Sequence, residues 1–211
     1  MCGRFTLTVD PADLQGTFAD FIFPSPFTPR YNIAPSQPIL AIPNDGTKRA
    51  DFFQWGLIPS WVKDPAVAAK LINARAETAA EKPSFRGSFK RKRCLIPADG
   101  FYEWKKDEKT KTPYFIYMKD RKPFAFAGLW DEWHSPDGSL LRTCAILTAA
   151  PNELIAALHN RMPLILEARR YADWLSSNSL TAADLSALIQ PFPSEKMSAH
   201  PVSKLVNVPF N

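Results

Sequence analysis

The second residue of the chain, Cys2, has the chemistry of a nucleophile once the residue before it is removed. Methionine aminopeptidases remove Met1 when the next side chain is small, so the mature chain is expected to begin with a free α-amine and a thiol on neighbouring carbons. Their ordinary pKa values are about 8 and about 8.5, which leaves both groups reactive at neutral pH. The amine would capture an aldehyde as a Schiff base, and the thiol would then close a thiazolidine ring. The alternative is that Cys2 is only a small residue at a frayed terminus.

The length and composition of the chain indicate the setting for this chemistry. With 211 residues, of which 45% are apolar, the chain is expected to form a single domain over residues 1–211. We find neither a long apolar run nor a secretory signal pattern, so we expect no membrane association and a cytoplasmic location, at the nucleoid if the source is bacterial. A net charge of +5 favours a polyanionic partner but does not identify one.

The cysteines argue against a metal or disulfide framework. Cys2, Cys94 and Cys144 are an odd number and form no C-x-x-C pair. We therefore expect three reduced thiols, no metal and no cofactor, and we expect the protein to be a monomer.

The elements that must position Cys2 are mostly strands. Short apolar runs between turn signals cover residues 39–42, 51–58, 94–105, 113–118, 124–133 and 140–148. Helical patterns begin at Asp10-Pro11 and return at 151–159, 167–176 and 181–190. We expect a loop over 27–38, a hairpin turn without a functional role over 105–111, and a closing strand over 203–208. The sequence thus predicts an α+β fold: a curved, barrel-like, mostly antiparallel sheet flanked by helices.

Several short motifs give the chain a family resemblance. They are CGRF at 2–5, RYNIAP at 30–35, WGLIPSW at 55–61, NARAET at 73–78, GFYEW at 100–104, HNRMP at 159–163 and HPVS at 200–203. In this order and spacing the chain closely resembles the SRAP (SOS-response-associated peptidase) family over nearly its whole length. The resemblance implies that Cys2 crosslinks to the ring-opened deoxyribose aldehyde of an abasic site in single-stranded DNA and so shields the lesion. The family name refers to a presumed autoproteolytic removal of the initiator residue.

The resemblance implies three further catalytic residues, each with a bland alternative. Glu103 lies between aromatic residues, where a carboxylate needs a partner, and would be the general acid/base; alternatively it is an outward-facing strand residue. His159 follows an apolar helical stretch and would donate a proton to open the sugar ring or at the imine; alternatively it interacts with a helix C-terminus. Asn73 would orient the cysteine or the sugar hydroxyls, or serve as a capping amide.

The expected DNA-binding residues have basic or planar aromatic side chains. Arg4, Arg75 and Arg161 each lie within two residues of a proposed catalytic residue, so their guanidinium groups could hold phosphates without reading sequence. Arg86 and the run 90–93 would supply further basic surface, unless they are only a solvated face. Trp61 would stack on or wedge against DNA, or be an ordinary core residue.

Two other classes of function remain open from the sequence. In a peptidase or amidohydrolase, Cys2 would attack a carbonyl group with help from Glu103 and His159. In a non-enzymatic reader of single-stranded nucleic acid, the basic and aromatic surface would act alone. A lyase activity is related to crosslinking, because an imine that fails to close its ring can undergo β-elimination.

Overall fold

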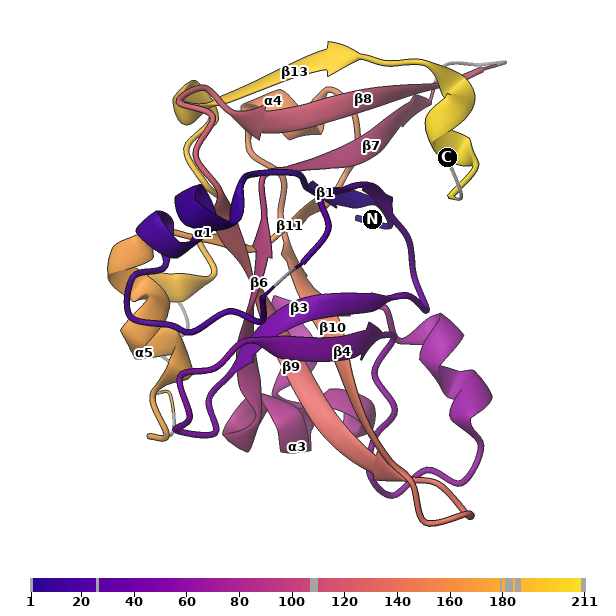
Figure 1. Ribbon diagram of the computed structural model, residues 1–211. Coiled ribbons are helices and arrows are strands. Elements are labelled where there is room, and N and C mark those ends of the chain that lie inside the picture. Colours follow the sequence, from indigo (N-terminus) through magenta and orange to yellow (C-terminus); the bar gives the residue numbers. More distant parts are fainter. Residues whose placement is uncertain are drawn as a thin grey trace.

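Two β-sheets form the framework of the protein. A computed structural model describes residues 2–25, 27–106, 110–178, 180, 184 and 187–209. The smaller sheet has five strands, in the spatial order β13 (Met197–Pro201), β8 (Lys111–Met118), β7 (Gly100–Lys106), β1 (Phe5–Leu7) and β2 (Arg30–Ile33). The larger sheet has the order β11 (Met162–Pro163), β10 (Leu140–Ala149), β4 (Asp51–Trp55), β3 (Pro38–Pro43), β6 (Arg93–Ala98), β9 (Phe124–His134) and β12 (Ile165–Leu166). Figure 1 shows the smaller sheet stacked on one end of the larger one.

The larger sheet closes into a barrel. Strands β9 and β10 pair along most of their length, from Leu140 opposite His134 to Ile146 opposite Gly128, and this joins the two ends of the β10-β4-β3-β6-β9 series. Most pairings are antiparallel, but β10 pairs in parallel with β4 and with the short strand β5 (Asn73–Arg75). The expected α+β fold around a curved, mostly antiparallel sheet is confirmed.

The apolar run over 94–105 is two strands in different sheets. The chain leaves the barrel at the end of β6 and enters the smaller sheet at Gly100, with Asp99 between them. The carboxylate of Asp99 accepts hydrogen bonds from the Thr8 N–H and hydroxyl groups at 2.6 Å. A Cβ atom at Gly100 would lie 2.3 Å from ring atoms of Phe115, so only glycine fits this corner. The corner brings β7 alongside the N-terminal strand.

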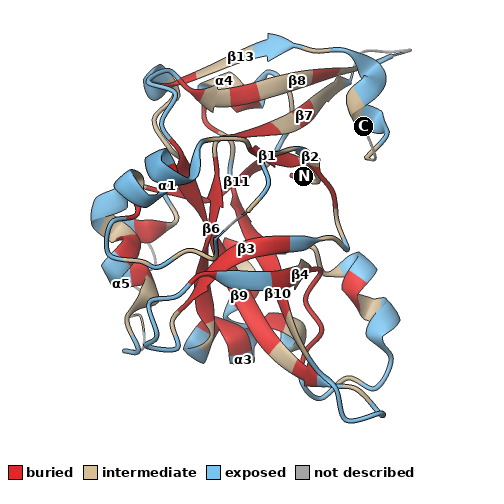
Figure 2. Cartoon of the chain, viewed as in Figure 1, coloured by how far each residue is buried: buried red, intermediate tan, exposed pale blue. Residues whose placement is uncertain are grey.

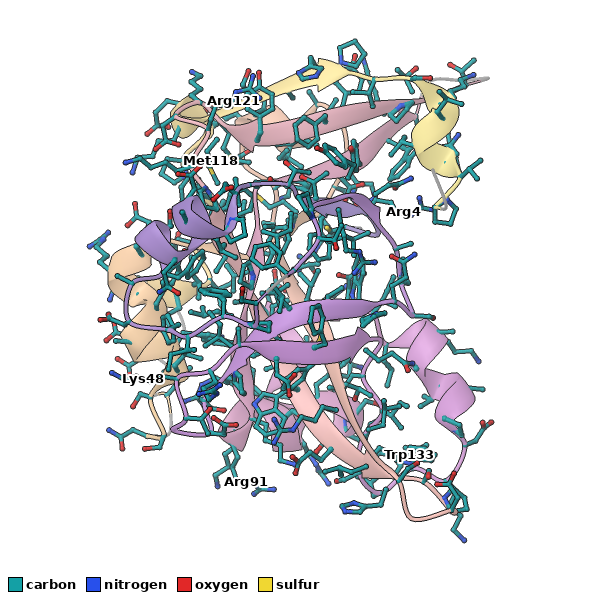
Figure 3. All side chains as sticks on the ribbon, viewed as in Figure 1. Arg4, Lys48, Arg91, Met118, Arg121 and Trp133 are labelled. Carbon is teal, nitrogen blue, oxygen red and sulfur yellow. The ribbon has the colours of Figure 1, made fainter. Side chains whose placement is uncertain are left out.

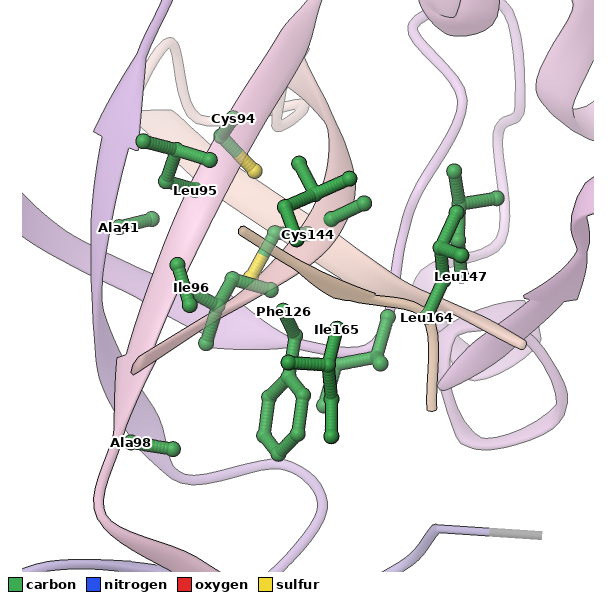
Figure 4. Packing of buried hydrophobic residues seen from close by; sticks show 14 of the residues in the cluster. Ala41, Cys94, Leu95, Ile96, Ala98, Phe126, Cys144, Leu147, Leu164 and Ile165 are labelled. Carbon is green, nitrogen blue, oxygen red and sulfur yellow. The ribbon is translucent and has the colours of Figure 1, made fainter. Parts of the chain in front are cut away.

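One hydrophobic core runs through both sheets. Phe5 of β1 packs edge-on against Trp55 of β4 and Phe126 of β9, with ring centroids 5.3 and 5.7 Å apart. Figure 2 shows the barrel strands β6, β9 and β10 coloured mainly as buried, whereas β13 at the edge of the smaller sheet is mainly intermediate or exposed. Figure 4 shows the barrel interior, where Cys94 and Cys144 lie among aliphatic side chains. All three cysteines are free and buried, as expected.

The helices are short and cover the outside of the sheets. They are α1 (Pro11–Thr17), α2 (Ala76–Ala79), α3 (Pro83–Arg91), α4 (Glu153–Ala156) and α5 (Tyr171–Leu175), together with 3-10 turns η1 (Pro65–Lys70), η2 (Ala168–Arg170), η3 (Ser194–Lys196) and η4 (Lys204–Asn207). The carboxylate of Asp10 caps α1 by accepting the Ala12 N–H at 2.8 Å, and Leu14 and Phe18 of this segment are buried. In the part of the chain described, no helix has the length and apolar character needed to cross a membrane.

Two local predictions are wrong. Part of the expected loop over 27–38 is strand β2, because Ile33 pairs with Phe5 of β1. The segment 203–208 is not a strand: the Ser203 hydroxyl caps the Leu205 N–H at 3.2 Å and starts η4, and the last strand is β13. The helix expected over 181–190 falls largely outside the described residues.

Candidate active site

Cys2 is held inside the protein at the start of an internal strand. Its side chain is fully buried, and Sγ lies 3.9 Å from the carbonyl oxygen of Arg4. Strand β1, which follows, is paired on both sides, with β7 and with β2. Burial raises the pKa of the Cys2 thiol, and the nearby charge of Glu103 raises it further. The thiol is therefore protonated at neutral pH, and the alternative of a frayed terminal residue does not hold.

Asn73 fixes the backbone of Cys2. Its Nδ2 donates a hydrogen bond to the Cys2 carbonyl oxygen at 2.8 Å. Asn73 lies on β5 and pairs with Ile146 of β10, so its position is set by the barrel. Its Oδ1 is buried and has no hydrogen-bond partner within the described residues. An unpaired buried acceptor is costly, so a hydrogen-bond donor facing Asn73 Oδ1 would be stabilising. An N-terminal amine or a sugar hydroxyl group would be such a donor.

Glu103 points into the protein, so the outward-facing alternative is wrong. It lies on β7, next to β1, and is 2% exposed. Burial raises the pKa of Glu103 above its ordinary range, and the charge of His159 acts in the opposite direction. The shift moves the pKa of this carboxyl group in the direction that favours general acid/base catalysis.

His159 is held by a turn that follows α4. The backbone N–H of Arg161 donates to Nδ1 of His159 at 3.0 Å. The carbonyl oxygen of Arg161 lies 3.2 Å from the same Nδ1, so the turn contacts this nitrogen through both backbone groups of Arg161. The ring thus contacts the backbone of Arg161 in this turn. The alternative from the sequence was an interaction with the C-terminal end of a helix.

A cavity of about 510 Å³ opens Glu103 and His159 to solvent, whereas Cys2 and Asn73 are not among its described lining residues. It is lined by Glu103, Trp104, Lys106, Lys111, His159 and Asn207. The two lysines belong to the hairpin to which the sequence assigns no role, and the structure places them beside the carboxyl and imidazole groups. Their charges suit an anionic substrate. A dense run of lysines at the end of a strand that carries Glu103 is the signal that could have indicated this role.

The three arginines near the residues that the sequence predicts to be catalytic differ in their contacts. Arg4 donates to Asn32 Oδ1 at 3.0 Å and to the carbonyl oxygen of Val206 at 2.7 Å, and Figure 3 shows it beside the C-terminal end of the chain. Arg161 binds both carboxylate oxygens of Glu77 at 2.8 Å. Arg75 is exposed at the end of β5. Only Arg75 therefore presents its side chain mainly to solvent.

Trp61 and Arg86 line a second cavity of about 460 Å³, together with Ser60, Arg91 and Lys92 among others. Trp61 is 66% exposed, so the core alternative is wrong for this residue. In Figure 1 helix α3, which carries Arg86, lies at the opposite end of the molecule from β7. The structure thus separates this pair from the cavity that contains Glu103.

Arg93 is not part of the expected basic surface. Its side chain is fully buried, and it donates to backbone carbonyl oxygens, including those of Trp174 at 2.7 Å and Phe89 at 3.0 Å. Its neighbours Lys90 and Arg91 are exposed. Among the described residues, no group of three or more His, Cys, Asp or Glu side chains is arranged to hold a metal ion.

The fold and the site define a class of protein: a β-rich protein in which a buried cysteine at position 2 lies near a carboxyl group, and that carboxyl group shares a cavity with an imidazole. A family model described as SOS response associated peptidase (SRAP) matches residues 1–209. The chain belongs to the SRAP family.

Curated relatives and solved structures agree with this membership. Abasic site processing protein YoqW of Bacillus subtilis is 48% identical over 215 residues, which cover 100% of this chain and 96% of the relative. Abasic site processing protein YedK of Escherichia coli is 33% identical, covering 98% of this chain and 94% of the relative. Abasic site processing protein HMCES of Xenopus tropicalis is 32% identical, covering 98% and 75%. A crystal structure of a Bacteroides thetaiotaomicron protein matches with a TM-score of 0.87 at 30% identity, covering 96% of this chain and 93% of that one.

Proposed function

We propose that this protein captures abasic sites in single-stranded DNA by forming a thiazolidine crosslink through Cys2 after Met1 is removed. The observation that carries the proposal is the burial of Cys2 next to Glu103, with its carbonyl oxygen held by Asn73. The relatives named above are all called abasic site processing proteins. An abasic site in its ring-opened form carries an aldehyde, which is the group that an aminothiol captures.

The proposed reaction balances without a cofactor. The Cys2 amine adds to the aldehyde carbon, and loss of one water gives the imine. The thiol S–H then adds across the C=N bond: sulfur bonds to carbon and the proton ends on nitrogen. Because this step uses a neutral thiol overall, the raised pKa of Cys2 is compatible with it. Glu103 would carry protons during water loss, and His159 would protonate the sugar oxygen as the ring opens.

The partner would be bound through its phosphates and bases. Lys106 and Lys111 line the cavity and would attract the backbone near the lesion. Arg75, exposed beside Asn73, would hold a flanking phosphate. Arg4 and Arg161 are engaged within the protein, so we propose that they shape the cavity and contact DNA only with the atoms that remain accessible. The protein would act as a monomer, at the nucleoid in a bacterial cell.

The decisive experiment mixes the purified protein, its N-terminal mass verified, with a single-stranded oligonucleotide carrying one abasic site, followed by a denaturing gel. We expect a slowly migrating, heat-stable protein–DNA band only when the DNA carries the abasic site. Cys2→Ala should abolish it, whereas Cys144→Ala, which removes a buried thiol on β10, should leave it. Intact DNA and borohydride-reduced abasic DNA, which lacks the aldehyde, should give no band. A missing band with correctly processed protein would contradict the proposal.

A peptidase is the second candidate, because the matching family model is described as a peptidase. Cys2 would attack the carbonyl carbon of Met1, with Glu103 and His159 moving protons, and water would release the methionine. We propose that this serves maturation. Hydrolysis of added peptides by the processed protein would instead make proteolysis its main activity.

A further inference from the structure

Glu77, to which the sequence assigns no role, lies four residues after Asn73 and anchors Arg161. Arg161 Nη1 donates to Glu77 Oε1 and Nη2 to Oε2, both at 2.8 Å, which is the two-pronged geometry that guanidinium and carboxylate groups favour. The Arg161 side chain is only 15% exposed. These hydrogen bonds lower the pKa of Glu77, so the ion pair persists at neutral pH. The pair is therefore better fixed than an ordinary surface salt bridge.

The same guanidinium also binds the barrel. Arg161 Nη2 donates to the carbonyl oxygen of Thr148 on β10 at 2.6 Å. Thr148 pairs with Arg75 of β5 and with Pro163 of β11, the strand that follows the turn at 159–161. Arg161 thus ties three segments together: the start of α2, strand β10 and the turn that carries His159.

The backbone of Arg161 holds the imidazole through Nδ1. Its N–H lies 3.0 Å from His159 Nδ1 and its carbonyl oxygen lies 3.2 Å from the same atom, so the position of this turn decides which of the two contacts is made. If the Arg161 side chain lost its hydrogen bonds to Glu77, the turn would lose one of the restraints that keep the Arg161 backbone against the ring. Loss of the Glu77 carboxylate would also leave a positive charge unbalanced two residues from His159.

We propose that Glu77 is a positioning residue: by clamping Arg161 it fixes the turn at 159–161 and so holds the His159 ring, through Nδ1, in a single tautomer. One residue joins the carboxylate to the imidazole, because the Arg161 side chain bonds Glu77 at 2.8 Å and the Arg161 backbone N–H bonds His159 at 3.0 Å. The consequence for the reaction rests on the proposed function, but the effect on the imidazole does not.

The first test therefore reads the imidazole directly. In wild-type protein labelled with ¹⁵N-histidine, long-range proton–nitrogen spectra should show His159 in one tautomer, with its signals assigned by their loss in His159→Gln. Glu77→Gln and Glu77→Ala should give a mixture of the Nδ1–H and Nε2–H forms. Glu81→Gln, an exposed glutamate in the segment after α2, should match wild type. An unchanged His159 spectrum in both Glu77 variants overturns the proposal.

The second test measures single-turnover crosslinking at several concentrations of abasic DNA. We expect Glu77→Gln to lower the maximal rate about tenfold, a larger factor than any change in the half-saturating DNA concentration, because the residue acts mainly through His159. If Glu77→Gln weakens DNA affinity but leaves the maximal crosslinking rate unchanged, the proposal is contradicted. If wild-type protein forms no crosslink while the spectra still change, the proposed function fails and the positioning role stands. Should Glu77→Ala not fold, the near-isosteric Glu77→Gln decides.

Discussion

The side chain of Asn73 donates a hydrogen bond to the carbonyl oxygen of Cys2 at 2.8 Å, and this bond links the two sheets. Asn73 belongs to β5, which pairs with the barrel strand β10, whereas Cys2 leads into β1 of the smaller sheet. The barrel thus fixes where the first peptide unit after the nucleophile lies. Preorganisation of this kind lowers the cost of aligning a reactive group.

Replacing Asn73 by alanine should slow crosslinking without weakening DNA binding. A hydrogen bond of this type contributes about 0.5–1.5 kcal/mol, so we expect a rate loss of roughly 2- to 12-fold. The rate is measured from denaturing gels at saturating abasic DNA, and affinity is measured with intact single-stranded DNA. Asn178→Ala, at an exposed site away from Cys2, is the matched control. A loss of affinity that accounts for the whole rate effect would count against an orienting role.

A Cys2→Ala variant with its initiator methionine removed should nick abasic DNA weakly. It keeps the terminal amine, so the imine still forms, but without the thiol the ring cannot close and β-elimination competes. Sequencing gels should show cleavage at the lesion, and borohydride should trap a covalent species. The same variant with an acetylated terminus should neither nick nor be trapped. An unacetylated Cys2→Ala that leaves the DNA intact would argue against an imine intermediate.

Glu103→Gln should make the protein more stable and less active. Because burial raises the pKa of Glu103, ionising this group costs more in the folded state than in the unfolded state. This cost is absent at acid pH and grows as the pH rises through the folded-state pKa, so the gain of the variant should appear near neutral pH and vanish in acid. Each kcal/mol corresponds to about 2–4 °C in Tm.

Thermal unfolding of both proteins across the acid to neutral range checks the sign of this effect, and gels check the crosslinking rate. An equal Tm difference at every pH would mean that the carboxyl group is not the cause. A wild-type crosslinking rate in Glu103→Gln would remove this residue from the proton-transfer steps.

Trp61→Ala should weaken binding to single-stranded DNA and leave folding intact. The ring is 66% exposed, so its loss removes little core packing. Stacking on a base contributes about 1–3 kcal/mol, which corresponds to a roughly 5- to 150-fold loss of affinity. Arg86→Ala, in the same cavity, should reduce the slope of log affinity against log salt by about 1. Lys122→Ala, exposed in the turn between β8 and β9, should change neither.

Fluorescence anisotropy at several salt concentrations measures both the affinity for single-stranded DNA and the dependence of this affinity on salt. Unchanged affinity in Trp61→Ala would leave the exposed tryptophan without a role in DNA binding.

The sequence predicts the strands of this protein better than the way they are joined. Short apolar runs between turn signals indicate most strands, but the break at Asp99 is not recognisable as a change of sheet because both halves of the run are apolar and strand-forming. The basic run that contains Arg93 looks like surface, since only the folded chain shows the carbonyl oxygens that surround its guanidinium group. Glu77 is a short-range neighbour of Asn73 in sequence, yet its partner Arg161 lies 84 residues away, and no local pattern specifies that pairing.

Because of the position of β1, the protein should resist pulling from its N-terminal end more strongly than pulling from its C-terminal end. A helicase or polymerase that pulled on DNA bonded to Cys2 would load β1 from its N-terminal end, and β1 is paired with β7 on one side and β2 on the other. Both ladders would have to shear together before the chain could yield. From the other terminus, η4 and then β13, an edge strand paired only with β8, can be peeled away one hydrogen bond at a time. If Cys2 is crosslinked to DNA as proposed, the protein would resist force applied through Cys2 and would unfold more easily when a protease pulls from the η4 end.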